Sequence, residues 1–187
     1  MDISSWNWAL IIIGVILVIN MINGFKMGIV KEAINCVSLL VLSLLVVLLG
    51  SVLKSYTDKE FIQMITMIIM VLIVVIVHRL LKKVFEGIDA IASLPVVSTL
   101  NKLAGAVFGV GETVLVVWFA LCLIGLFDLG HAGEYIYMYI GKSPLLSFLY
   151  QNNLIATLGE TIRGPEFQMK AMEFILEQSK EIVEKIL

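Results

Sequence analysis

One acidic side chain stands inside a long apolar run, where it could bind a proton or line a path for ions. Glu112 belongs to the run 103–127 and follows the basic Lys102 by ten residues. At about 1.5 Å per residue, a helix from Lys102 would carry Glu112 about 15 Å into a bilayer, near its centre. An unpaired charge at that depth costs several kcal/mol, so a carboxyl group there needs a partner or water.

Two interpretations of Glu112 are open from the sequence. It either lines a water-filled path and exchanges protons, or it is a protonated glutamate that hydrogen-bonds between helices. Polar residues on the other apolar runs provide candidate partners for the second interpretation. These are Asn20, Asn35, Ser38 and Ser43.

Two pairs of glycines have the spacing that brings membrane helices close together. Gly24 and Gly28 form one pair, and Gly105 and Gly109 form the other. Glycines four residues apart share one face of a helix and let another backbone approach closely. The second pair predicts a packing face within the run 103–127. The first pair allows an alternative, a tight turn that uses the conformational freedom of glycine.

No arrangement of residues in the sequence predicts an enzyme or a metal site. His78 and His131 have no ligand spacing with the two cysteines, and Cys36 and Cys122 stand inside apolar runs as small hydrophobic residues. Nucleophile-elbow, zinc-protease and phosphate-loop motifs are absent from the sequence. A basic patch large enough for nucleic acid is also missing. We therefore expect a protein without enzymatic activity, without a cofactor and without a nucleic-acid partner.

Four long apolar runs must position these residues, and they determine the fold class. The chain has 187 residues, of which 60% are hydrophobic, and a mean hydropathy of +1.02. Runs of about 17 to 25 apolar residues match the thickness of a bilayer, and their backbones must be helical because lipid offers no hydrogen bonds. The sequence predicts an all-α integral membrane four-helix bundle over residues 1–127. The four spans are expected at 6–22, 33–53, 61–77 and 103–127.

Amphipathic segments are expected outside the four spans. Between the third and fourth spans, apolar residues recur at helical spacing over 79–92. This predicts a helix in the membrane interface, or alternatively a soluble connector. Residues 128–187 form an amphipathic helical tail, in which Ser143 and Pro144 begin one helix and Gly164 and Pro165 introduce the last. The acidic face of that last helix disfavours anionic lipid, so we expect it to bind a partner or a second copy.

The distribution of basic residues predicts the orientation of the spans. Six basic residues fall on one side of the membrane, whereas the other side has two, Lys54 and Lys59. The positive-inside rule places the six in the cytoplasm, so both termini and the tail are expected outside. The six interfacial basic residues are Lys26, Lys31, Arg79, Lys82, Lys83 and Lys102.

The order of several short motifs resembles the CvpA family, the colicin V production proteins. The segment NGFKMGIV at 23–30 is similar to the family's hairpin between the first two spans. LPVVSTLNKLAGAVFG at 94–109 is similar to its proline-containing lead-in and glycine-rich fourth helix. SPLL at 143–146, followed by YQNN at 150–153, extends the resemblance over roughly residues 10–155.

The resemblance implies a bacterial protein of the cytoplasmic membrane, linked to toxin production or export and to envelope homeostasis. It supplies no catalytic residue. We expect a membrane scaffold or accessory protein, which contacts the lipid bilayer and either further copies of itself or other membrane proteins. The alternative is an oligomeric channel or transport protein lined by the glycine-rich fourth span.

Overall fold

In the computed structural model, the described residues are helical apart from short turns. It describes residues 8–54, 56, 59–87 and 99–186. Four helices are long and apolar enough to cross a membrane, which confirms the predicted fold class. They are α1 (Trp8–Met27), α2 (Ile29–Lys54), α3 (Glu60–Gly87) and α4 (Thr99–Leu126). Four further helices follow, α5 (Gly130–Lys142), α6 (Pro144–Gln151), α7 (Leu154–Arg163) and α8 (Pro165–Ile186).

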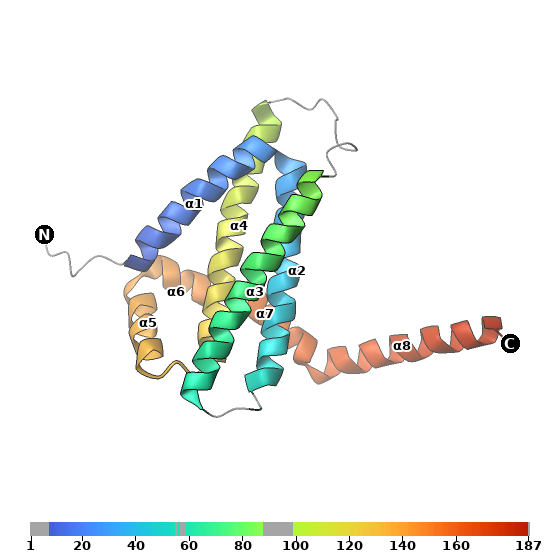
Figure 1. Cartoon of the computed structure of the whole chain (residues 1–187). Helices are drawn as coiled ribbons and strands as arrows, with labels where there is room; N and C mark the ends of the chain where they lie inside the picture. Colours follow the sequence, from blue (N-terminus) through green and yellow to red (C-terminus); the bar gives the residue numbers. More distant parts are fainter. Residues whose placement is uncertain (1–7, 55, 57–58, 88–98, 187) are drawn as a thin grey trace, which may run out of the picture.

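The four long helices alternate in direction (Figure 1). The junction of α1 with α2, the end of α3 and the start of α4 gather at one end of the bundle, drawn at the top. The helices α5 to α7 lie toward the opposite end. The basic residues predicted to share one side of the membrane therefore belong to helix ends that lie together.

The connection between the first two spans is much shorter than the sequence predicted. A single residue, Gly28, separates α1 from α2, and its φ of +82° lies in the left-handed region that favours glycine. The amide of Gly28 donates to the carbonyl oxygen of Gly24 at 2.9 Å. The amide of Ile29, the first residue of α2, donates to Asn101 Oδ1 at 3.0 Å. The helices can therefore meet almost without a loop, because these exposed backbone groups have partners.

The predicted interfacial helix does not form a separate element in the described residues. Residues 79–87 continue α3 without a break, and the remainder of the predicted segment, 88–92, lies outside the described residues. No glycine or proline interrupts the chain between His78 and Glu86. The change from an apolar run to an amphipathic pattern therefore marks the end of the apolar part of one helix, and it does not mark a new helix.

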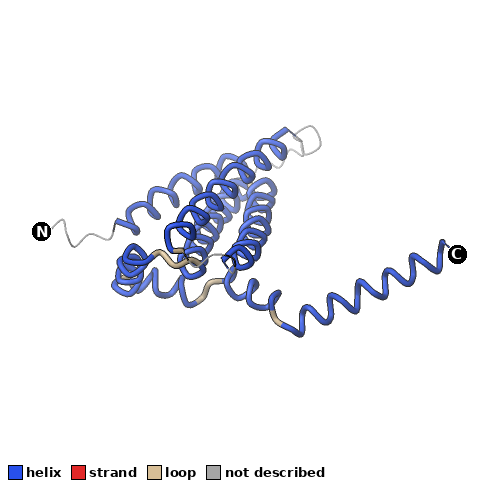
Figure 2. Tube along the Cα trace, turned by 60° about the horizontal axis from the view of Figure 1, so that its bottom comes forward, coloured by secondary structure: helices blue, strands red, loops and turns tan. Residues whose placement is uncertain are grey.

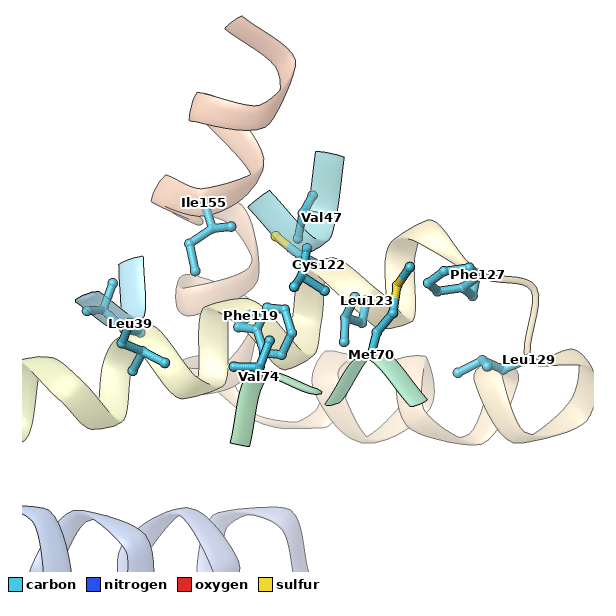
Figure 3. Close-up of a cluster of buried hydrophobic side chains, with 12 residues drawn as sticks. Leu39, Val47, Met70, Val74, Phe119, Cys122, Leu123, Phe127, Leu129 and Ile155 are labelled. Carbon is cyan, nitrogen blue, oxygen red and sulfur yellow. The ribbon is translucent and has the colours of Figure 1, made fainter. Parts of the chain in front are cut away.

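The largest hydrophobic core fills the space between α2, α3, α4 and α7 (Figure 3). Leu123 of α4 is 1% exposed and meets Met70 and Val74, which reach it from α3. From α7, Ile155 is 0% exposed and enters the same core. The bundle core thus depends on a helix that follows the fourth span.

The helices α5 and α6 also pack back onto the bundle. Leu146 and Leu149 of α6 meet Val117 and Leu121 of α4 in a second core cluster. The start of α6 confirms the predicted cap, because Ser143 Oγ accepts from the amide of Leu146 at 3.3 Å. Asn153 caps α7 in the same way, by accepting from the amide of Ala156 at 3.1 Å.

The last helix, α8, projects away from the bundle (Figure 2). Among the described elements, α8 makes most of its contacts with α7, the helix that precedes it in the chain. Apolar side chains along its first half are exposed. They are Phe167, Met169, Met172, Phe174, Ile175 and Leu176.

Candidate functional site

A close contact between the backbones of α1 and α4 positions the fourth span. A Cβ atom on Gly105 would lie 2.9 Å from both Cα and the carbonyl carbon of Gly28, and still closer to the carbonyl oxygen of Gly24. A Cβ atom on Gly109 would lie 2.7 Å from the carbonyl carbon of Asn20. Gly105 therefore faces both glycines of the first pair, and Gly109 faces the backbone of α1 one turn earlier, at Asn20. Gly28 additionally serves as the turn, so the two interpretations of the first pair are compatible.

Polar side chains reinforce this contact, which we call the glycine seam (Asn20, Gly24 and Gly28 against Gly105 and Gly109). Asn20 Nδ2 donates to Thr113 Oγ1 at 3.2 Å. Thr113 Oγ1 in turn donates to the carbonyl oxygen of Gly109 at 3.1 Å, and its side chain is buried. The seam places one face of α4 against α1, and this sets the rotation of α4 about its axis and so the direction of its other side chains.

Glu112, one residue before Thr113, faces α3. Its Oε1 lies 3.1 Å from His78 Nε2 and 3.5 Å from Lys82 Nζ. The Glu112 side chain is 6% exposed, whereas those of His78 and Lys82 are 14% and 18% exposed. His78 and Lys82 are four residues apart, so they share the face of α3 that meets Glu112.

A second carboxyl group from α2 completes the cluster. Glu32 is 0% exposed, and its Oε2 accepts a hydrogen bond from Asn35 Nδ2 at 3.2 Å. The carboxyl groups of Glu32 and Glu112 lie within hydrogen-bonding reach of each other. Among the described residues, no donor reaches Glu32 Oε1 or Glu112 Oε2. We call Glu32, Asn35, His78, Lys82 and Glu112 the polar cluster.

The predicted partners of Glu112 were wrong. Within the described part of the chain, Asn20 bonds to Thr113 and Asn35 bonds to Glu32, so neither contacts Glu112. Ser43 is buried with its hydroxyl unpaired, and Ser38 makes no described bond to the carboxyl group. The physical reason is rotation about the helix axis, because Glu112 faces α3 whereas Thr113 faces α1.

Sequence reasoning did not assign Glu32, His78 or Lys82 to a site with Glu112, although the spacing of these residues contained signals. Glu32 and Asn35 are three residues apart at the start of an apolar run, which places them on one helical face. His78 and Lys82 show a similar spacing at the end of another run. Only the distance between the helices, which the sequence does not contain, brings these two faces to Glu112.

Most of the basic residues predicted to lie in the interface are exposed at the same end of the bundle. Lys82 differs from them, because it is half-buried and its ammonium group lies 3.5 Å from Glu112 Oε1. Lys102 Nζ lies 5.9 Å from the ring centroid of Phe25, at the distance of a cation–π contact. The others are Lys26, Arg79, Lys83 and the half-buried Lys31.

The described residues contain no group of histidine, cysteine and acidic side chains that could hold a metal ion. The cysteines are separate free thiols. Cys36 Sγ donates to the carbonyl oxygen of Phe108 at 3.2 Å, and Cys122 Sγ lies 3.5 Å from Asn153 Oδ1. Each thiol thus lies beside an acceptor oxygen on another helix or turn, as expected for a cysteine side chain packed between helices.

Four apolar helices around a buried polar cluster define a multi-pass α-helical membrane protein. A family model described as colicin V production protein matches residues 10–153, which include all four spans and the polar cluster. The chain belongs to this family, as its motifs indicated. A search of curated proteins and a search of solved structures each give no significant match. The helices α7 and α8 lie beyond the matched residues.

Proposed function

We propose that this protein is a non-enzymatic accessory or scaffold protein of the bacterial cytoplasmic membrane. In this role it supports toxin production or export and envelope homeostasis by binding other membrane or secretory proteins. The observation that carries the proposal is α8, which extends from the bundle with its apolar side chains uncovered. An amphipathic helix of this kind is stable in water only when another surface covers its apolar face.

The charge of α8 favours a protein over a lipid as its partner. Over residues 165–177, Glu166, Glu173 and Glu177 outnumber Lys170. Anionic lipid headgroups would repel this acidic face, whereas a partner protein with basic residues beside an apolar groove would attract it. The proposed contact is therefore helix-in-groove, with Met172, Ile175 and Leu176 as anchors.

Site-specific photocrosslinking in living cells tests this proposal. A crosslinking residue at Ile175, on the apolar face, should give a discrete protein adduct or a dimer of the chain. The same residue at Glu173, on the acidic face of the same helix turn, is the matched control and should give little product. Labelling of lipid alone from Ile175 would contradict the proposal, as would equal labelling from both positions.

The proposal includes an orientation with both termini outside the cytoplasm. The clustering of the basic residues at one end of the bundle supports it, because such residues remain on the cytoplasmic side. In a background without Cys36 and Cys122, cysteine at Lys83 should be protected from an impermeant thiol reagent in intact cells. Cysteine at Gln178 should be labelled. The opposite pattern would reverse the orientation.

A channel or transport protein is the second candidate, and the polar cluster favours it. Buried ionisable residues inside membrane spans commonly mark paths for ions or protons. The glycine face of α4 does not favour it, because α1 of the same chain covers Gly105 and Gly109 and a lumen cannot use them. Purified protein in liposomes should pass ions if this candidate is correct. An oligomeric preparation that shows no flux under voltage or tension would exclude it.

A further inference from the structure

The polar cluster has an imbalance of charge that a single proton would correct. Glu32 and Glu112 carry two negative charges when both are ionised, and Lys82 supplies one positive charge. His78 adds a hydrogen-bond contact to Glu112 Oε1. A surplus negative charge in a site with such low exposure would be strongly unfavourable, because a desolvated charge needs a partner.

The hydrogen bonds of the cluster identify where such a proton would sit. Glu112 Oε1 already has His78 and Lys82, and Glu32 Oε2 already has Asn35. The remaining oxygens, Glu112 Oε2 and Glu32 Oε1, are buried without a donor, although the two carboxyl groups adjoin. A proton between them gives both oxygens a partner. A metal cation is disfavoured there, since the Lys82 ammonium group already occupies the adjacent position.

We infer that Glu32 and Glu112 together bind one proton, which the two carboxyl groups share. The pair then carries a single negative charge, which the ammonium group of Lys82 balances. Glu112 Oε1 keeps its contacts with His78 and Lys82, and the shared proton gives Glu112 Oε2 and Glu32 Oε1 a partner.

The neighbours of the cluster are compatible with this role. From α2, Cys36 lies beside the acidic pair, and its Sγ is held by the Phe108 carbonyl oxygen. From α1, Met27 Sδ accepts from Asn35 Nδ2 at 3.7 Å, and the described contacts with the cluster include no titratable side chain of α1. The exposure of the cluster side chains rises from Glu32 through Glu112 to His78 and Lys82, so the shared proton lies at the most buried part of the cluster.

The cluster also links α3 to α4, two helices whose backbones touch little. The α3 backbone packs chiefly against α2, and polar links from α3 to α4 in this half of the bundle run through Glu112. Loss of the shared proton would place two buried carboxylates against each other beside these links. We therefore expect the packing of α3 against α2 and α4 to depend on the occupancy of this site.

Infrared difference spectroscopy of the full chain in nanodiscs tests the inference. The wild-type protein should show the carbonyl stretch of a protonated carboxyl group at a pH where exposed glutamates are ionised, shifted in D2O. Glu32→Gln and Glu112→Gln should each abolish this band, because the remaining carboxylate then pairs with amide donors and Lys82. Glu134→Gln, which alters an exposed glutamate outside the spans, should leave the band unchanged.

The band of the wild-type protein decides the inference. If the wild-type protein lacks the protonated-carboxyl band at neutral pH, the shared proton is overturned, and this result holds even if a variant fails to fold. His78→Gln keeps a hydrogen-bond donor to Glu112, so the band should remain in this variant. Loss of the band there would overturn a proton held by the carboxyl pair.

Discussion

The first and third spans run in the same direction beside the fourth, yet they are attached to it by different means. The backbone of α1 touches the backbone of α4 along the glycine seam, where no side chain intervenes. The spans α3 and α4 lie farther apart, and their contact is made by side chains. Met70 and Val74 of α3 reach the apolar core, and His78 and Lys82 reach Glu112.

This difference separates a fixed contact from an adjustable one. Close backbone packing leaves no freedom, because any side chain at Gly105 or Gly109 would overlap the α1 backbone. Long side chains that meet through charge can rearrange when a proton binds or leaves. The α1–α4 pair therefore forms the frame of the bundle, whereas α3 is the span whose position is able to respond.

The largest expected effect comes from breaking the glycine seam. Gly109→Leu should destabilise the bundle by more than about 3 kcal/mol, because the backbone of Asn20 cannot move aside. Thermal unfolding of the purified protein in detergent measures the loss. Gly111→Leu on the same helix is the matched control, since a Cβ atom there meets nothing within 4 Å. Equal stability of the two variants would contradict the seam.

The next effect should come from the attachment of α3. Glu112→Leu should cost about 2 kcal/mol, because it leaves the half-buried side chains of His78 and Lys82 without an acceptor. Glu112→Gln keeps the shape and an acceptor oxygen, so its cost should stay below about 1 kcal/mol. The difference between their unfolding temperatures is the measurement. A leucine variant as stable as wild type would mean that Glu112 does not hold α3.

A smaller effect is expected from the hydrogen bond within the seam. Thr113→Val preserves the shape of the side chain but removes the acceptor for Asn20, at a cost of about 1 kcal/mol. This separates the polar contribution to the seam from the contribution of close backbone packing. Chemical denaturation in detergent, compared with Gly109→Leu, provides the test. A loss as large as that of the glycine variant would mean that the hydrogen bond, rather than the backbone contact, holds α1.

The smallest effect should come from the ion pair at the edge of the cluster. Lys82→Met should cost at most about 1 kcal/mol, because Lys82 is partly exposed, His78 remains bound to Glu112, and a second proton on the carboxyl pair can replace the lost charge. Lys83→Met, at an exposed neighbouring position, should be neutral. Added salt should reduce the difference between the two variants. A difference that is insensitive to salt would show that Lys82 acts by packing rather than by charge.

The sequence by itself determined the class of protein and the positions of its spans. Runs of apolar residues specify membrane helices wherever they occur, because the bilayer requires each segment to satisfy its own backbone hydrogen bonds. Local signals of the same kind correctly predicted the Ser143 cap and the close-packing role of Gly105 and Gly109. Glu112 also stood out, because an acidic residue in an apolar run is costly wherever the chain places it.

Only the tertiary structure decided which faces meet. The seam joins Gly24 to Gly105 and the cluster joins Glu32 to Glu112, pairs of residues that lie far apart in the chain. A rotation of α4 by one residue about its axis would exchange the partners of Glu112 and Thr113. That rotation is set by how closely the glycines let α1 approach, and it is a property of several helices together. Periodicity within one helix therefore identifies a polar or small face, and the packing of the bundle selects its partner.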